Sequence, residues 1–263
     1  MILAFLFAAV LTGSDQVPSP PPADIEPSTA TEWAITATAL AGAAAIDRWL
    51  QPATCTWCDR DGQGNDTLNA FDKSARDALR WSDGNLHKAD VLSYVTEYAP
   101  ALLLFVHRDG QTVSRALVAL ESLAATDLAT GGLKVAFARE RPNVHFAAET
   151  GIAPNVRDSN KSFPSGHASG AFALLFAMAE TCRLESCSYE RTIWAVGAPL
   201  AITTLWLRVA ADQHYMTDVL AGAGVGAGFG WWLPQWRQRV RRGAFIEPSI
   251  GARVRAVSVR YAW

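Results

Sequence analysis

The sequence predicts an all-α protein, a helical bundle that ends in a small β-hairpin. Half of its 263 residues are apolar, which is enough to bury one substantial core. From residue 31 onward the apolar residues recur with helical spacing, and almost no stretch alternates as a strand would. The exception is the C-terminal ARVRAVSVRYAW, which alternates after the turn-like EPSIG. The chain therefore predicts one helical domain with a short ribbon appended.

The helices are separated by clusters of glycine, proline and polar residues. These clusters are DRDGQGND at 59–66, HRDG at 107–110 and the polar stretch 142–164. The predicted helices are 31–50, 67–82, 88–107, 111–140, 167–183, 190–209 and 213–240. The stretch 142–164 shows no periodicity, and loops of this length inside a compact domain are commonly functional.

The N-terminal segments do not belong to the helical domain. Residues 1–14, MILAFLFAAVLTGS, are an apolar run too short to span a bilayer comfortably; they predict a signal peptide, with a membrane-anchoring start as the alternative. Residues 15–30 are rich in proline and predict a disordered linker. The helical domain then covers 31–242, and the hairpin tail covers 243–263.

The charge of the chain argues against nucleic acid as a partner. The formal net charge is −2, whereas nucleic-acid binders usually carry a concentrated basic field. The one basic run, RQRVRR at 237–242, is typical of a solvated helix end.

The four cysteines form two close pairs, Cys55 with Cys58 and Cys182 with Cys187. An even count in an exported chain predicts disulfides, and local pairing is the simplest arrangement. A structural zinc site or a redox motif is the alternative, although neither the strand pattern nor a second regular CxxC accompanies it.

The first of three polar motifs is KVAFARERP, residues 134–142. Lys134 and Arg141 are seven residues apart, which is two helical turns, so they share one face if the helix continues. Pro142 disfavours helical geometry in the residue before it, so we expect Arg141 at the helix exit, pointing into the following loop. Arg139 lies well round the helix from Lys134 and is expected to be solvated.

The second motif is FPSGHASG, residues 163–170, at the start of an apolar helix. Ser165 can donate its hydroxyl hydrogen, Gly166 lets the backbone approach an anion closely, and His167 stands at the helix entrance. A helix start of this kind attracts an anion because its first N–H groups have no partner within the helix.

The third motif is RVAADQHYMTD, residues 208–218. His214 and Asp218 are four residues apart, so on one helix the carboxylate can accept the imidazole Nδ1 proton and leave Nε2 free to attack. The spacing from Arg208 to His214 does not fit one helical face. We therefore expect a break near 210–212, with Asp212 as a candidate N-cap.

Together the motifs Lys-x6-Arg-Pro, Pro-Ser-Gly-His and Arg-x5-His-x3-Asp resemble the three-part signature of the type 2 phosphatidic acid phosphatase and vanadium haloperoxidase superfamily. The resemblance spans residues 134–218, about a third of the chain. It implies the helical-bundle fold of that superfamily. One departure is Leu207, which stands where the family usually has serine; this removes a hydroxyl but no charged group.

The resemblance also implies a role for each motif residue. A phosphate would be bound by Lys134, Arg141, Ser165, Gly166 and Arg208. His214 would be the nucleophile and form a phosphohistidine, Asp218 would orient it, and His167 would protonate the leaving alkoxide and later activate water. Phosphoryl transfer is accelerated chiefly by positioning and fixed cations. We therefore expect no metal or other cofactor, and vanadate is expected as an inhibitor.

Three functional hypotheses follow. The first is a metal-independent phosphomonoesterase acting on a small-molecule or lipid phosphate ester, an isoprenyl diphosphate included. The second is a haloperoxidase that holds vanadate as its cofactor in the same site. The third is a protein that binds phosphate without turnover, which would not need both histidines and Asp218 together.

Several polar residues outside the motifs call for a simpler interpretation. We expect His87, His107 and His145 to be structural or surface residues, because no motif surrounds them. Asp127 is seven residues before Lys134 and could pair with it.

The cellular location is inferred from charges and cysteines. Only 192–207 and 219–233 approach membrane-spanning length with few charges. Acidic residues interrupt the other apolar segments, at Asp47, Glu97, Glu121, Asp127 and Glu180. We therefore expect an exported, periplasmic enzyme that is soluble or peripherally attached to a membrane. The alternative is an integral inner-membrane protein whose site faces outward, which would place the second cysteine pair in the reducing cytoplasm.

Overall fold

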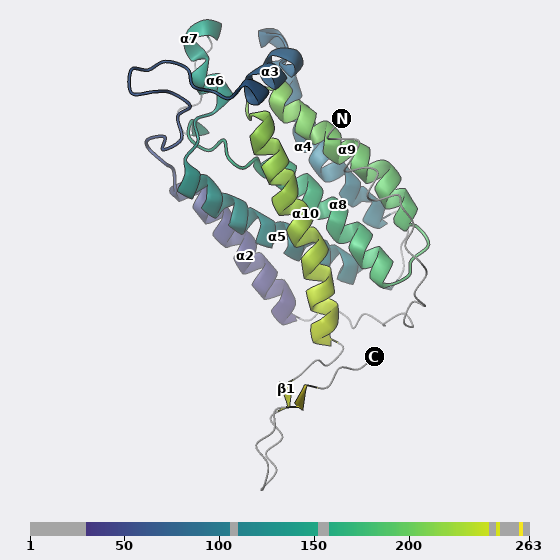
Figure 1. The fold of residues 1–263 in the computed structure, drawn as a ribbon. Helices are drawn as coiled ribbons and strands as arrows, with labels where there is room; N and C mark the ends of the chain where they lie inside the picture. The colour runs from purple at the N-terminus through teal and green to yellow at the C-terminus, as the bar shows by residue number, and fades with distance from the viewer. Residues whose placement is uncertain (1–29, 106–109, 152–157, 242–245, 248–257, 260–263) are drawn as a thin grey trace.

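The computed structural model of the chain describes residues 30–105, 110–151, 158–241, 246–247 and 258–259. Within them the chain is almost entirely helical, which confirms the predicted all-α fold class (Figure 1). The longer helices are α2 (Ala30–Trp49), α3 (Ala70–Leu79), α4 (Leu86–Tyr98), α5 (Thr112–Phe137), α8 (Gly166–Leu184), α9 (Glu190–Ala210) and α10 (Met216–Arg241). The shorter ones are η1 (Asp83–Asn85), η2 (Ala99–Phe105), α6 (Pro142–His145) and α7 (Ala147–Thr150).

Helix α8 lies in the middle of the bundle and packs against α5, α9 and α10 (Figure 1). Its buried apolar side chains form the main core with residues of α5, α9 and η2. This core includes Leu104, Leu123, Leu174, Leu175, Met178, Tyr189 and Ile193. A core of this kind stabilises the bundle through the apolar area that it removes from water.

Three glycines let α10 approach α8 closely. A Cβ atom at Gly222 would lie 2.4 Å from the Ser165 carbonyl oxygen, and one at Gly226 would lie 2.0 Å from the Ser169 carbonyl oxygen. Gly230 repeats the pattern one turn further along, 2.5 Å from the carbonyl oxygen of Ala173. Because no side chain fits between the two backbones, the beginning of α10 is held against the beginning of α8.

The structure corrects two predicted helix boundaries. The helix predicted over 88–107 is α-helical only to Tyr98 and continues as the 3₁₀ segment η2, because Pro100 cannot donate the hydrogen bond that an α-helix needs. The helix predicted over 111–140 ends at Phe137, since Ala138 adopts a left-handed conformation with φ 41°. Lys134 and Arg141 are therefore not on one continuous helix.

Four helices begin or end at the same end of the bundle. Helices α5 and α9 end there, α8 and α10 begin there, and α3, α6 and α7 lie around them (Figure 1). Each of the three polar motifs therefore belongs to this end of the molecule.

Two described helices, α5 and α9, are long and apolar enough to cross a membrane. The predicted 192–207 lies within α9, whereas α5 takes the place of the predicted 219–233. About half of each apolar window is buried inside the bundle, 44% in α5 and 50% in α9. The same composition therefore also fits core helices of a soluble protein.

The ends of the chain lie largely outside the described residues. The predicted signal peptide and all but the last residue of the predicted linker fall in residues 1–29. At the C-terminus, β1 (Ile246–Glu247) pairs antiparallel with β2 (Ser258–Val259). These four residues do not establish a hairpin over the whole of 243–263, which stays a prediction.

Candidate active site

The residues of the three motifs meet at the shared end of the bundle. The Ser165 N–H donates to the Asp218 carbonyl oxygen at 3.0 Å, which joins the second motif to the third. The Lys134 Nζ atom would lie 3.4 Å from a Cβ placed on Gly166, which brings in the first motif. Residues distant in sequence therefore form one site, as the resemblance implied.

Three cations of this site lie close enough to disfavour one another's charge. Burial, followed by the Arg141 and Lys161 cations, lowers the pKa of Lys134 to about 7. Burial and the neighbouring Arg208 lower the pKa of Arg141 to about 10. Burial also lowers the pKa of Arg208. Because the cations repel one another in a site of low dielectric, a bound anion would stabilise all three.

Several buried hydrogen-bond donors beside these cations have no partner among the described residues. They are the hydroxyl of Ser165 and the Nε atoms of Arg141 and Arg208. Buried polar atoms are usually paired, so unpaired donors that converge call for an acceptor. A tetrahedral anion offers several acceptor oxygens at once. We call Lys134, Arg141, Ser165, Gly166 and Arg208 the anion cradle.

The backbone completes this cradle at the start of α8. Ser165 is the N-cap residue of the helix, yet its side chain makes no capping hydrogen bond. The hydroxyl therefore does not close off the first N–H groups, which a helix of this length presents together with the positive end of its dipole.

Side chains on neighbouring elements hold the two arginines in place. Arg208 Nη1 donates to Ser93 Oγ at 3.1 Å and forms an ion pair with Asp90, both on α4. Arg141 Nη1 donates to Gln213 Oε1 at 2.6 Å. Each guanidinium group is thus anchored through Nη1, which fixes the direction of its Nε side.

His214 lies in the turn before α10 and is only 2% exposed. Its Nδ1 atom is 2.7 Å from the Ser162 carbonyl oxygen, and since a carbonyl only accepts, Nδ1 carries the proton and Nε2 does not. Burial, followed by the cations Arg141 and Arg208, holds the pKa of His214 well below its usual range. A neutral imidazole with a bare Nε2 is the form that a nucleophile requires.

The position of His214 corrects the expected contact with Asp218. The Asp218 Oδ2 atom is 3.9 Å from His214 Nδ1, so the carboxylate is not its hydrogen-bond partner. The i, i+4 argument failed because His214 precedes the helix, which starts at Met216.

Asp218 instead fixes the two segments on either side of His214. Its Oδ2 atom accepts from Ser162 Oγ at 2.5 Å and from the Tyr215 N–H at 2.8 Å. Its Oδ1 atom accepts from Arg139 Nη1 at 2.7 Å. Asp218 therefore orients the histidine indirectly, through the residue that contacts it and the residue that follows it.

Arg139 corrects a second expectation, because it is fully buried rather than solvated. Besides Asp218, its guanidinium group forms ion pairs with Asp59 at 2.9 Å and Asp72 at 3.0 Å. The helical-wheel argument failed because the left-handed Ala138 ends the helix and turns the chain inward just before Arg139. The described structure thus places this arginine directly behind Asp218.

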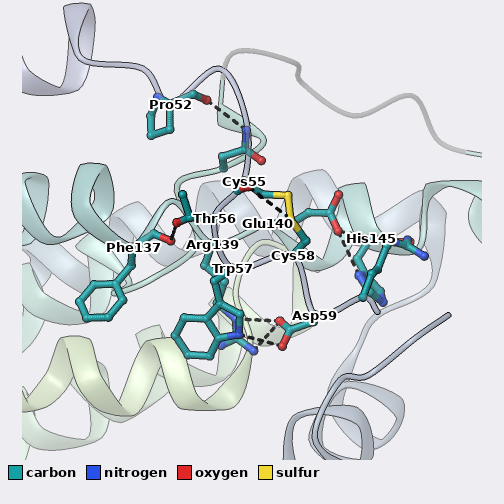
Figure 2. The surroundings of a disulfide bond; sticks show 12 residues. Pro52, Cys55, Thr56, Trp57, Cys58, Asp59, Phe137, Arg139, Glu140 and His145 are labelled. Carbon is teal, nitrogen blue, oxygen red and sulfur yellow. Dashed lines mark hydrogen bonds and ion pairs between the residues drawn. A yellow bond between two sulfur atoms is a disulfide. The ribbon is translucent and has the colours of Figure 1, made fainter. Parts of the chain in front are cut away.

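The loop closed by the Cys55–Cys58 disulfide packs against Arg139 (Figure 2). The Glu140 N–H donates to the Trp57 carbonyl oxygen at 3.0 Å, and the Arg139 guanidinium carbon lies 4.1 Å from the centre of the Trp57 ring. The second predicted pair, Cys182 with Cys187, also forms a disulfide. Local pairing of the cysteines is therefore confirmed.

Asp212 lies at the expected break but does not cap α10. It is 1% exposed and accepts hydrogen bonds from Arg76 on α3 at 2.6 Å and from Arg80, the residue after α3, at 2.9 Å. Its φ of 57° is left-handed. The residue therefore joins the turn to α3, and the prediction of an N-cap is wrong.

His167 stands at the first turn of α8, and its Nδ1 atom is 2.5 Å from Glu97 Oε2 on α4. The Tyr94 ring and the imidazole lie edge to face, with their centroids 4.2 Å apart. Burial, followed by the cations Arg208 and Lys134, holds the pKa of His167 well below its usual range. No motif contains Glu97; its only signal in the sequence was an acidic residue inside an apolar segment.

The remaining residues singled out in the sequence lie outside this arrangement. His145 is buried in a structural contact, with Nδ1 3.0 Å from Glu140 Oε2 and Nε2 3.2 Å from Asp66 Oδ1. His87 is exposed, and His107 lies outside the described residues. Asp127 lies close enough for the Lys134 cation to lower its pKa, although burial dominates and raises that pKa to about 6.

The donors of the site suit an anion better than a cation. Among the residues that the structure describes, no group of three or more histidine, cysteine, aspartate or glutamate side chains could hold a metal ion. The cradle consists of ammonium, guanidinium, hydroxyl and N–H groups, all of which donate hydrogen bonds.

Fold and site together define a helical bundle with a candidate anion site and two imidazoles, of which His214 is buried and His167 is partly exposed. The sequence model of the PAP2 superfamily matches residues 115–242, a range that contains all three motifs. The chain belongs to the PAP2 superfamily.

A search of solved structures finds the transmembrane PAP2-type phosphatidylglycerolphosphate phosphatase from Bacillus subtilis. It is 18% identical, with a TM-score of 0.48, over 81% of this chain and 98% of that chain. No curated protein matches the chain.

Proposed function

We propose that the protein is a phosphomonoesterase that works through a phosphohistidine intermediate and needs no metal. Membership in the PAP2 superfamily indicates a phosphoric ester hydrolase. The single observation that carries the finer proposal is the convergence of three cations and unpaired donors on two imidazoles of different surroundings. Orthovanadate would compete with phosphate for the same cradle.

In the first step the anion cradle holds the phosphate group of the ester. His214 Nε2 attacks phosphorus, forming the P–N bond while the P–O bond to the leaving group breaks. His167 gives its Nε2 proton to the departing alkoxide, which leaves as an alcohol. The fixed cations stabilise the charge that spreads over the phosphoryl oxygens.

In the second step water replaces the alcohol. His167, now with a bare Nε2, accepts a proton from water as its oxygen attacks phosphorus. The P–N bond breaks, and inorganic phosphate leaves with His214 neutral again. General acid–base assistance of this kind contributes roughly 10² to 10⁴ in rate.

Apolar side chains beside the site favour an ester with an apolar portion, such as a lipid phosphate or an isoprenyl diphosphate. Phe137, the last residue of α5 after Lys134, is 42% exposed, and Tyr94 beside His167 is 49% exposed. Phe137 also contacts Phe163, next to the second motif, at a centroid distance of 4.9 Å. Exposed aromatic rings at the entrance to a charged site would contact a hydrocarbon chain.

The surface favours attachment to a membrane. Large apolar side chains are exposed along α2, α4 and α10, namely Trp33, Ile35, Trp49, Val91, Leu92, Val95, Trp231, Trp232, Trp236 and Val240.

One disulfide lies at the site end of the bundle, and the other closes the far end of α8, about 28 Å away by helix length. Two oxidised ends favour an exported protein bound peripherally in the periplasm. Retention in the membrane fraction during alkaline extraction would indicate a spanning protein instead.

The test of the proposed function is His214→Ala, assayed with an aryl phosphate. Without the nucleophile we expect kcat/KM to fall by about 10³-fold or more. The matched control is His87→Ala, an exposed histidine outside the site that should retain the parent rate. Brief incubation with ³²P-labelled substrate should yield an acid-labile, base-stable label on the parent only. Undiminished turnover by the His214 variant would refute the nucleophile.

A further inference from the structure

We propose that Glu97 is a positioning residue for His167, one that keeps the imidazole in its acid form while Gly170 provides the space for the carboxyl group. This inference rests on the proposed phosphatase function and deepens it. It assigns a role to a residue that lies outside the three motifs and in a different helix from the histidine.

The contact between Glu97 and His167 is a buried one. Glu97 is 3% exposed, and its Oε2 atom lies 2.5 Å from His167 Nδ1 although the residues are 70 positions apart. Because Nδ1 faces the carboxyl group, Nε2 is the nitrogen left for the site. The carboxyl group thereby selects both the orientation and the tautomer of the ring.

The chain makes room for this carboxyl group with a glycine. Gly170 lies one turn after His167 on α8, and a Cβ atom there would be 2.2 Å from Glu97 Oε1 and 3.4 Å from Leu123 Cδ1. No non-glycine residue fits at that distance without displacing Glu97. The position of the Glu97 carboxyl group therefore depends on both α4, which carries it, and α8, whose Gly170 leaves space for it.

The surroundings explain why His167 needs this partner. Burial and the cations Arg208, Lys134 and Arg141 all lower the pKa of the imidazole, so by itself it would not hold a second proton near neutral pH. The groups that face Glu97 act in the other direction. Burial and the Asp127 carboxylate raise its pKa to about 8, whereas Tyr98, Arg208 and Lys134 lower it. The pair therefore shares one proton and titrates as a unit.

The proton balance follows from this sharing. In the acid form one proton lies between Glu97 Oε2 and Nδ1, and a second is on Nε2. When the Nε2–H bond breaks, an O–H bond forms on the leaving alkoxide. The shared proton remains on Nδ1, which leaves a neutral imidazole beside a carboxylate. Its bare Nε2 is the base that later accepts the proton of water.

The test is Glu97→Gln, compared on two substrates that differ in their need for an acid. An alkyl phosphate has a poor leaving group, whereas p-nitrophenyl phosphate has a good one. We expect kcat/KM of the variant to fall by about 10²-fold for the alkyl ester and by much less for the aryl ester. A merely structural role would lower both to the same degree.

The pH profile supplies a second readout. The parent should lose kcat, which reports the substrate complex, as pH rises through about 8, the pKa to which burial raises Glu97, because the pair then gives up its acid proton. In Glu97→Gln this fall in activity should occur at lower pH, because no carboxylate then counters the cations that lower the pKa of His167. A limb that does not move would overturn the proposal.

Gly170→Ala tests the same contact without changing a titratable group. It should push the carboxyl group away from His167 and reproduce the selective loss on the alkyl ester. The matched control is Gly224→Ala on α10, where an added Cβ meets nothing within 4 Å. Circular dichroism checks folding, and if Glu97→Gln does not fold, the glycine variant decides. Equal losses on both esters in the folded variant would contradict the role of Glu97, whereas the His214 variant tests the proposed function separately.

Discussion

His214 and His167 face the same three cations, yet Nδ1 of each imidazole has a different kind of partner. Nδ1 of His214 donates to a backbone carbonyl, whereas Nδ1 of His167 meets a carboxyl group. A neutral acceptor leaves the first imidazole neutral with a bare Nε2, whereas in our proposal a titratable partner lets the second hold an extra proton. In the proposed mechanism, the contact that each imidazole makes at Nδ1 therefore distinguishes the nucleophile from the acid.

The two histidines are also braced differently. Behind His214 stand Asp218 and the buried Arg139 with its further carboxylates, so many long-range contacts hold that side. In the described part of the chain, His167 contacts the carboxyl group of Glu97 and the ring of Tyr94, and its side chain is 18% exposed. We therefore expect damage to the nucleophile side to be general and damage to the acid side to depend on the leaving group.

The largest effect within this comparison is expected for Asp218→Asn. The amide offers one acceptor oxygen fewer, so it cannot hold both the Ser162 hydroxyl and the Tyr215 N–H while facing Arg139. Displacing His214 by a fraction of an ångström should lower kcat/KM by about 10²-fold. The loss should be equal for alkyl and aryl phosphates, in contrast to Glu97→Gln. The control is Asp77→Asn, at an exposed position on α3. If the loss in Asp218→Asn depended on the leaving group, the expected difference between the surroundings of His214 and those of His167 would be contradicted.

Next we expect Arg139→Met to act mainly on stability. Removing the cation leaves Asp59, Asp72 and Asp218 buried without their shared partner, which should lower the free energy of unfolding by about 3 to 5 kcal/mol. Denaturant unfolding followed by circular dichroism measures this change. Arg239→Met, at an exposed position on α10, should cost less than about 0.5 kcal/mol. A stable Arg139 variant would show that the carboxylates find other partners.

The smallest effect is expected from opening the disulfide loop. Replacing Cys55 and Cys58 with alanine frees the loop that carries Trp57, which packs on Arg139 behind the nucleophile. We expect kcat/KM to fall by about 3- to 10-fold for both esters. Replacing Cys182 and Cys187 removes a disulfide at the other end of α8 and should leave kcat/KM unchanged. Equal losses of kcat/KM in the two double variants would show that the Cys55–Cys58 loop has no specific effect on the site.

Much of this site could be predicted because its signals are local. The three motifs each lie within a dozen residues, and spacing within a helix or turn is set by the chain itself. The cysteine pairs are local for the same reason. The predicted solvation of Arg139 failed because a single left-handed residue, Ala138, changed the direction of the chain.

By itself the sequence determined the helical bundle, the family and the order of the cationic and histidine motifs, because periodicity and spacing are properties of neighbouring residues. The tertiary structure alone decided which atom each imidazole contacts. The Ser162 carbonyl reaches His214 across 52 residues and Glu97 reaches His167 across 70. Contacts of that range depend on how helices pack, and here the packing depends on glycines that let α10 and the carboxyl group of Glu97 approach α8.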